Sequence, residues 1–353
     1  MAERRPETTD AKREVSSATQ AKRDRGRADR VLPGLWRLRL PLPWSGVPHV
    51  NAFAVRGNDG VVLVDTGIHG PGAMKELERA LEQAGWTLRD ITLLVCTHAH
   101  SDHYGLAAPV TEAAGCELWM HPRHEHMTNA VSDPEQALER RIEVAQQSGV
   151  PLAPLRRWAE ERKSQPPTIA GVVLPDRDLV RGVEVETALG TWVVYETPGH
   201  APSHVVLHQA EQRLLLSGDH LLGRVSLYFD YGWTPDPVAE FLASLDEVDQ
   251  LDARLCLPGH GRPFTDVRAR IRANREEIRE RLEVTEDAIG GQGELTAFEL
   301  MPLVFGRELD PMMTSWILTI LLCFLTHLER SGRLERLDPS APDAPERWRV
   351  VKS

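Results

Sequence analysis

Cysteine is scarce in this chain, and the segments that usually accompany secretion are missing as well. Only four cysteines occur among 353 residues, and no two of them form a Cys-x-x-Cys pair. A disulfide-stabilised secreted domain would contain a denser set. The N-terminus is charged and polar, where a secretory signal would need an apolar segment. We therefore expect packed, reduced thiols in a cytoplasmic protein.

Positive charge and long apolar segments are also in short supply. The formal net charge of −11 disfavours nucleic acid and anionic membranes as partners, although a local basic patch could override the sum. The most apolar stretch, residues 312–328, is interrupted by Thr and Ser and falls short of the roughly 18 apolar residues of a membrane-spanning helix. We expect instead a helix buried on several faces, which could form a homodimer contact, and no membrane association.

The order of apolar segments predicts an α/β protein. Residues 1–30 are charged and polar and are interpreted as a disordered tail, so the fold is expected to begin near Val31. Strand-like runs then alternate with helical segments in two successive halves, which predicts two β-sheets sandwiched between helices. Residues 121–175 interrupt this order with a charged, helical segment, interpreted as an inserted cap. Together these segments form a main domain over residues 31–288.

A glycine-rich segment follows that domain. Residues 290–293 read Gly-Gly-Gln-Gly and predict a flexible linker after a long charged helix. Residues 294–353 then contain two helical segments and a possible short hairpin formed by residues 333–337 and 347–351. This order of elements resembles a winged-helix module, so we expect a small C-terminal domain of that kind.

The strongest chemical signal is the motif THAHSDH at residues 97–103, directly after an apolar, strand-like run. Three imidazoles and one carboxylate within six residues make chemical sense if they face a cation. Imidazole together with carboxylate suits zinc and, less exclusively, iron or manganese. In an extended stretch His98 and His100 point to the same side and can bind one ion. Asp102 and His103 follow a turn and can be aimed at a second ion.

Three further candidate ligands stand at the ends of later strand-like runs. His200 ends the turn TPGH, Asp219 ends the turn SGD, and His260 lies in the turn PGHG. Loops at strand ends commonly carry functional side chains. With the four ligands of the first motif, these three side chains suffice for two ions.

The combined motifs resemble those of the metallo-β-lactamase superfamily. The pattern HxHxDH at residues 98–103 is followed by His200, Asp219 and His260 in the order that this family shows, and VDTG at residues 64–67 matches its early acidic motif. The resemblance covers about residues 31–265 and implies a metallo-β-lactamase αββα sandwich. It agrees with the order of elements described above.

This resemblance implies a dinuclear centre of two divalent metal ions, for which Zn²⁺ is preferred and Fe or Mn are alternatives. The implied ligands are His98, His100 and His200 for one ion and Asp102, His103 and His260 for the other. Asp219 would bridge the two ions, and Asp65 would orient a ligand histidine. A hydroxide shared by the two ions would attack the substrate, and Asp102 is the candidate catalytic residue that orients it and passes a proton to the leaving group.

Residues beside these motifs are candidates for the substrate pocket. His220 directly follows Asp219 and either faces the pocket or packs. Tyr228 and Tyr231 are candidates by position, because residues 226–234 follow the Asp219 loop. The three histidines of HPRHEH at residues 121–126 are interpreted as a solvated segment at the entrance of the cap rather than as a third metal site.

The fold class leaves the substrate open. One candidate is a small ester or thioester of the acyl-coenzyme A or glutathione type, because the cap carries Leu152, Leu155 and Trp158, which could close over a small acyl group. The alternative is an endoribonuclease or phosphodiesterase, which the C-terminal order of elements favours and the acidic composition disfavours. A remote alternative is a DNA- or protein-binding regulator that acts through the C-terminal module.

Overall fold

The computed structural model describes residues 25–44, 46–306, 311–337, 339, 341 and 344–351. Most of the expected disordered tail, residues 1–24, lies outside them. The first strand begins at Arg27, so the expectation that the fold begins near Val31 was wrong. This strand lies at the edge of its sheet, where Asp29 forms an ion pair with Arg37 at 2.6 Å. An edge strand can carry many polar residues, which is why a search for apolar runs missed it.

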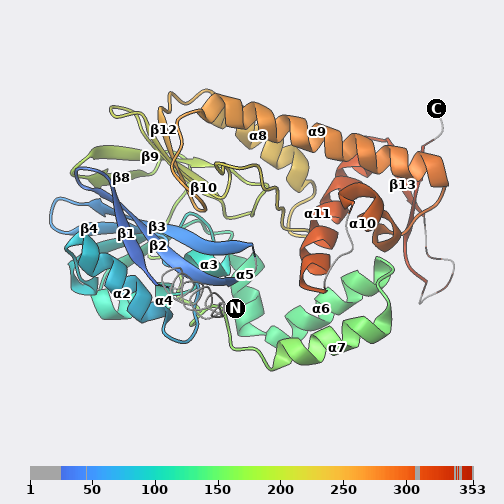
Figure 1. The fold of residues 1–353 in the computed structure, drawn as a ribbon, viewed down its shortest axis with the longest axis horizontal. Helices are drawn as coiled ribbons and strands as arrows, with labels where there is room; N and C mark the ends of the chain where they lie inside the picture. The colour runs from blue at the N-terminus through green and yellow to red at the C-terminus, as the bar shows by residue number, and fades with distance from the viewer. Residues whose placement is uncertain are drawn as a thin grey trace, which may run out of the picture.

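Two β-sheets form the core of the main domain, in the left half of Figure 1. The seven-stranded sheet contains, in spatial order, β1 (Arg27–Leu32), β2 (Leu35–Trp44), β3 (Val47–Arg56), β4 (Val61–Val64), β5 (Ile91–Val95), β6 (Glu117–Met120) and β7 (Arg177–Asp178). The five-stranded sheet contains β12 (Leu255–Pro258), β11 (Leu214–Gly218), β10 (Val205–Gln209), β9 (Gly190–Glu196) and β8 (Glu184–Thr187). Strands β10 and β11 follow each other in the chain and pair antiparallel as a hairpin.

Alternation along the strands divides the buried residues between two faces. In β4, Val62 and Val64 pack against Leu216 and Leu257 of the other sheet, whereas Leu63 faces the outer helices. The outer face of the first sheet is covered by α2 (Ala73–Ala84) and α4 (Ala107–Ala114), and that of the second by α8 (Pro237–Asp249) and α9 (Val267–Gln292). The predicted sandwich of two sheets between helices is therefore confirmed.

Residues 121–175 form the predicted helical insertion. It contains α5 (Glu125–Ser132), α6 (Pro134–Gln147) and α7 (Leu152–Lys163). The carboxylate of Asp133 accepts a hydrogen bond from the backbone N–H of Gln136 at 3.0 Å, and Pro134 occupies the first turn, so the sequence defines where α6 begins. Figure 1 shows α6 and α7 at the end of the molecule that also holds the C-terminal helices.

The C-terminal segment does not begin with a flexible linker, and that prediction was wrong. Helix α9 continues through Gly290 and Gly291 to Gln292. Its last turns are stabilised by packing, because Ile289 is fully buried in the same hydrophobic cluster as Leu295. This packing outweighs the weak helix propensity of glycine. Two helices follow, α10 (Ala297–Phe305) and α11 (Pro311–Arg330), and then the predicted antiparallel hairpin of β13 (Leu334–Leu337) and β14 (Arg347–Val350).

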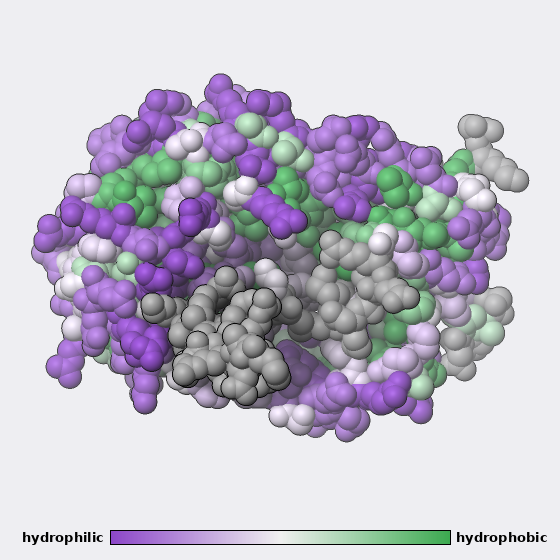
Figure 2. All heavy atoms as spheres, in the orientation of Figure 1, coloured by the Kyte–Doolittle hydropathy of each residue, from purple (hydrophilic) through white to green (hydrophobic). Residues whose placement is uncertain are grey.

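Helix α11 contains the most apolar stretch of the sequence. Leu321, Phe324 and Leu325 are fully buried in one cluster with α8, α9 and α10, which confirms the expectation of a helix buried on several faces. Within the described ranges, no helix combines the length and the apolar character that crossing a membrane requires. Hydrophilic residues cover most of the edge of the face drawn in Figure 2, and hydrophobic residues appear on it only in patches. The four cysteines are free thiols.

Candidate metal centre

The candidate ligands converge because both sheets direct the ends of their strands toward the same region. Asp65 directly follows β4, and His98, His100, Asp102 and His103 follow β5. The short helix α3 (Ser101–Tyr104) turns the chain, so that Asp102 and His103 face a different point from His98 and His100. His200, Asp219 and His260 follow β9, β11 and β12. The structure thus brings all seven candidate ligands together.

Three imidazole nitrogens meet at the first candidate site. Nε2 of His98 and Nε2 of His200 each lie 3.0 Å from Nδ1 of His100. A metal with tetrahedral Zn–N bonds of about 2.0–2.1 Å would hold its ligand atoms about 3.3 Å apart, close to this spacing. A single proton can bridge two of these nitrogens but cannot satisfy three. The donor set therefore fits a divalent cation.

The second candidate site joins carboxylates and imidazoles. Nε2 of His260 lies 3.2 Å from Oδ2 of Asp102 and 3.2 Å from Oδ2 of Asp219. Nε2 of His103 lies 3.4 Å from Oδ1 of Asp219, and both of these atoms are buried without a hydrogen-bond partner among the described residues. Buried polar atoms are rarely left unsatisfied. A cation between them would satisfy both.

Each of the five histidines uses its outward nitrogen to donate to a neighbouring acceptor. Four of these acceptors are carboxylate or carbonyl oxygens, and the fifth is the Thr97 hydroxyl, which itself donates to Asp65. The pairs are His98 with Thr97 at 3.0 Å, His100 with Asp230 at 2.9 Å, His103 with Asp65 at 2.8 Å, His200 with the carbonyl of Tyr228 at 3.1 Å, and His260 with the carbonyl of His49 at 2.9 Å. In the neutral tautomer that these acceptors select, the inward nitrogen of each ring carries a lone pair, as metal ligation requires.

Electrostatics in the second site favour a bound cation. Burial alone would lower the pKa of His260, but the carboxylates of Asp219 and Asp102 outweigh it and raise that pKa to about 10. Burial alone would raise the pKa of Asp219, but His260 and His103 outweigh it and hold that pKa well below its usual range. Asp102 and Asp219 therefore remain charged at neutral pH and attract positive charge.

The first site is electrostatically different. Burial lowers the pKa of His98 well below its usual value, with neighbouring histidines adding to the effect. Burial and the nearby His100 imidazole likewise lower the pKa of His200 to about 4, although Asp219 opposes them. Both rings are therefore neutral at physiological pH. The third ligand, His100, differs, because Asp230 outweighs its burial and raises its pKa. Neutral imidazoles are the form that binds metal.

Comparison with known proteins identifies this arrangement. The family model of the metallo-beta-lactamase superfamily matches residues 45–260, a segment that contains all seven candidate ligands. The chain belongs to the metallo-β-lactamase superfamily. The hydroxyacylglutathione-hydrolase-like branch remains an expectation from the sequence.

Several known proteins resemble this chain over most of its length. The probable metallo-hydrolase YqjP of Bacillus subtilis (strain 168) is 28% identical over 314 residues, which cover 85% of this chain and 91% of that protein. A metallo-beta-lactamase family protein of Thermus thermophilus, TTHA1429, superposes with a TM-score of 0.77 at 28% identity, over 91% of this chain and 100% of that one. A beta-lactamase domain protein of Burkholderia ambifaria gives a TM-score of 0.74 at 27% identity, over 92% and 93%.

Several residues in contact with the candidate ligands were not predicted from the sequence. Asp230 accepts a hydrogen bond from His100, and Nε2 of His204 accepts one from the backbone N–H of Asp219 at 3.1 Å. Neither lies in a motif whose spacing suggests a site. The position of Asp230 within residues 226–234, a segment expected to line the pocket, was the only available signal.

The interpretation of HPRHEH as a solvated segment was wrong. His121, His124 and His126 are 4%, 9% and 6% exposed. His121 contacts Glu196 at 2.8 Å, and Nε2 of His126 lies 2.7 Å from the hydroxyl of Ser203. The segment is buried because α5 packs directly on the loops that follow the strands. A charged sequence pattern could not reveal this tertiary contact.

A cavity of about 930 Å³ adjoins the first candidate site. Tyr228, Asp230 and His126 line its inner end, and the ring centroid of Tyr228 lies 5.6 Å from that of His100. The cap and the C-terminal helices supply most of the remaining wall, which is largely apolar. That wall includes Met127, Val144, Leu155, Trp158, Met301, Trp316, Leu318 and Leu322.

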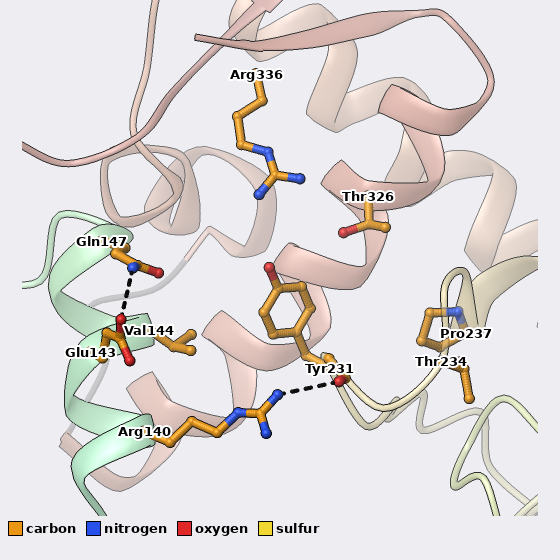
Figure 3. Close-up of a pocket in the computed structure, with 10 residues that line it drawn as sticks. Arg140, Glu143, Val144, Gln147, Tyr231, Thr234, Pro237, Thr326 and Arg336 are labelled. Atoms are coloured by element: carbon orange, nitrogen blue, oxygen red, sulfur yellow. Dashed lines mark hydrogen bonds between the residues drawn. The ribbon is translucent and has the colours of Figure 1, made fainter. Parts of the chain in front are cut away.

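The three suggested pocket residues differ in position. Tyr228 and Tyr231 both line the large cavity. Tyr231 also lines a neighbouring pocket of about 360 Å³, where its ring points toward Thr326 and Arg336 (Figure 3). His220 lines neither space; it is buried, with its ring centroid 4.7 Å from that of Phe241.

Proposed function

We propose that this protein is a dinuclear metal-dependent hydrolase that acts on a small ester or thioester with an apolar acyl group. The observation that carries the proposal is the pairing of a three-histidine site with a histidine–aspartate site, the first of which adjoins the inner end of a largely apolar cavity. The likeness to the probable metallo-hydrolase YqjP supports the hydrolase assignment. Two divalent ions bound at the clusters, with Zn²⁺ preferred over Fe or Mn, would polarise the substrate and provide an activated hydroxide at neutral pH.

The protein's own groups would orient the reaction. Asp102 is 5% exposed, and the imidazoles of His103 and His260 outweigh its burial and lower its pKa, so it stays ionised at neutral pH and can orient a water molecule by accepting a hydrogen bond from it. Burial keeps the pKa of Tyr228 well above its usual value. Its phenol therefore stays protonated, and by exchanging its contact with Asp230 for the substrate it can donate a hydrogen bond to the substrate carbonyl as negative charge develops there.

The cavity favours an acyl substrate over a polynucleotide. A channel for RNA needs basic side chains along the backbone path and open access. Here aliphatic and aromatic side chains, including Leu155, Trp158 and Trp316, predominate in the wall. Its two arginines, Arg140 and Arg141, are accompanied by the acidic Asp133, Asp230 and Glu299, so the wall is not basic overall. A volume of about 930 Å³ lies within the range of about 300–1,000 Å³ typical of small-molecule sites. An acyl-coenzyme A or glutathione thioester combines an acyl group for this cavity with a good leaving group.

The C-terminal module supports the cavity rather than a nucleic-acid surface. Its order, α10, α11 and the hairpin, together with a bridge between Leu295 and Trp348, is consistent with a winged-helix module. Helix α11, however, is buried against α8 and α9 and supplies Leu318 and Leu322 to the cavity wall. A helix used in this way is not available to read a DNA groove. This argues against the DNA-binding alternative.

The test is a substrate panel run on protein reconstituted with Zn²⁺, Fe²⁺ or Mn²⁺. Acetyl-, butyryl- and octanoyl-coenzyme A, S-lactoylglutathione and p-nitrophenyl esters would be compared with single-stranded RNA and bis-p-nitrophenyl phosphate. We expect metal-dependent turnover of the acyl compounds and a decrease after Leu155→Arg, which places charge in the cavity. Efficient cleavage of RNA or of the phosphodiester, with no acyl turnover, would overturn the substrate assignment in favour of the nuclease alternative.

A further inference from the structure

The cap contributes one buried histidine to the surroundings of the first candidate metal site. The side chain of His126, on α5, is 0% exposed. Its Nδ1 lies 2.9 Å from Oδ2 of Asp230, and its Nε2 lies 2.7 Å from Oγ of Ser203. The same Asp230 oxygen lies 2.9 Å from Nε2 of His100. Three segments that are distant in the sequence therefore meet at His126.

These contacts form a closed ring with a consistent direction of donation. The backbone N–H of Ala99 donates to Oγ of Ser203 at 3.1 Å, which leaves the Ser203 proton for Nε2 of His126. Nδ1 of His126 then carries the proton that faces Asp230, in an approach too oblique for a good hydrogen bond. His100 donates to the same carboxylate from Nε2. We call the set Ala99, His100, Ser203, His126 and Asp230 the His126 ring.

We propose that His126 is a positioning residue, through which the cap holds His100 in the orientation that presents Nδ1 to a metal ion. The inference rests on the proposed metal centre. Without His126, the Asp230 carboxylate would lose one of its two imidazole neighbours, and the Ser203 hydroxyl would lose its acceptor. Asp230 and the segment around Ala99 could then move, and His100 with them. Partners of this kind fix both the tautomer and the direction of a ligand histidine.

The ring also links the metal centre to the cavity. His126 and Asp230 both line the inner end of the cavity, while Ser203 and Ala99 are fully buried beneath it. A ligand that occupies the cavity can therefore contact the Asp230 carboxylate, which in turn contacts the covered imidazole of His126. The cap thus serves both to enclose the substrate and to complete the support of a metal ligand.

Two other interpretations of these residues use the same contacts. Ser203, His126 and Asp230 have the order of partners found in a serine nucleophile triad. Ser203 is 0% exposed, however, and its Oγ already accepts the Ala99 N–H, so a substrate carbonyl cannot reach it. His100, His126 and Asp230 also place donor atoms within 4.8 Å of one another, as a third metal site would. Both nitrogens of His126 and Nε2 of His100 already face protein partners, which favours the positioning role.

The experiment measures metal binding of the full chain by competition titration of the apoprotein with Zn²⁺ and Co²⁺. His126→Phe keeps a flat ring but removes both nitrogens, and His126→Gln retains one polar group. His124→Phe is the matched control, because His124 lies on the same segment and its Nδ1 pairs with Thr128, which is outside the His126 ring. We expect His126→Phe to lower the affinity for one of the two ions by about 10- to 100-fold and His126→Gln to lower it less. The control should bind both ions with wild-type affinity.

Several outcomes would overturn the proposal. Wild-type affinity for both ions in His126→Phe would remove the positioning role and leave the proposed function intact, whereas a wild-type chain that binds no metal would remove both. A third ion lost on His126→Phe would indicate a metal site instead. Loss of turnover in Ser203→Ala with full metal content and affinity, together with fluorophosphonate labelling of the wild type, would indicate a nucleophile. If circular dichroism showed that both His126 variants are unfolded without metal, His126 would have a purely structural role.

Discussion

Gly259 lies directly against the carboxylate of Asp219. A Cβ atom added at Gly259 would lie 2.2 Å from Oδ1 of Asp219 and 2.7 Å from Cε1 of His103. Contacts this short cannot persist, so a side chain at this position must displace two candidate ligands. The turn PGHG therefore contributes more than His260 to the second site: its glycine leaves the space that Asp219 occupies.

We predict that Gly259→Ala impairs metal binding although it changes no ligand. Displacement of Asp219 and His103 should lower the affinity of the second site for its ion by about 10- to 100-fold, with a comparable loss of turnover. Metal titration of the apoprotein measures this effect. Gly70→Ala is the matched control, because a Cβ atom there meets nothing within 4 Å. Equal metal affinity of the two variants would mean that Asp219 is not held as described.

Tyr228→Phe removes the phenol that faces the cavity beside His100 and His200. Because burial keeps this hydroxyl protonated, its loss should remove a hydrogen-bond donor to the developing oxyanion. We predict that kcat falls by about 10- to 100-fold with little change in KM and with full metal content. Steady-state kinetics with metal analysis of the same samples tests this. A change in KM alone would assign Tyr228 to binding rather than to transition-state stabilisation.

His220 should make the stability of the metal-free protein depend on pH. Burial, with a smaller effect of His200, lowers its folded pKa to about 3, well below the usual value of 6.5. Between these values the unfolded chain binds the proton and the folded chain does not, so stability falls as pH falls, by about 1.4 kcal/mol per pH unit from this group. In denaturant unfolding, the free energy of unfolding of His220→Leu should decrease less steeply between pH 6 and pH 4 than that of the wild type. If the free energy of unfolding had the same slope against pH in the variant and the wild type, His220 would be accessible to protons in the folded state.

Gly291→Ala tests whether residues 290–292 form a helix or a linker. Within α9 this position has open space around it, so alanine can be accommodated and costs less conformational entropy than glycine. We predict that the free energy of unfolding rises by about 0.5–1 kcal/mol. A flexible linker would show no gain, and the original expectation of two separately folded parts would then be restored.

The sequence predicted the order of elements and the convergence of the seven candidate ligands, because apolar periodicity and imidazole–carboxylate spacing are local properties. It did not reveal the residues that support those ligands. Asp230 and Ser203 meet His100 and His126 only through the packing of the cap on the sheet loops, and no spacing encodes that contact. For the same reason the buried state of HPRHEH and the continuation of α9 through Gly290 were missed. In both cases tertiary burial outweighed the local pattern.

The most direct test of the account is the number of divalent ions bound per chain. Apoprotein would be loaded with Zn²⁺, passed through a desalting column and analysed by elemental mass spectrometry alongside His98→Ala and His103→Ala. We predict two ions for the wild type and a reduced number for each variant, with the folded far-ultraviolet spectrum retained. A wild-type chain that hydrolyses its substrate at full rate with no bound metal would contradict it.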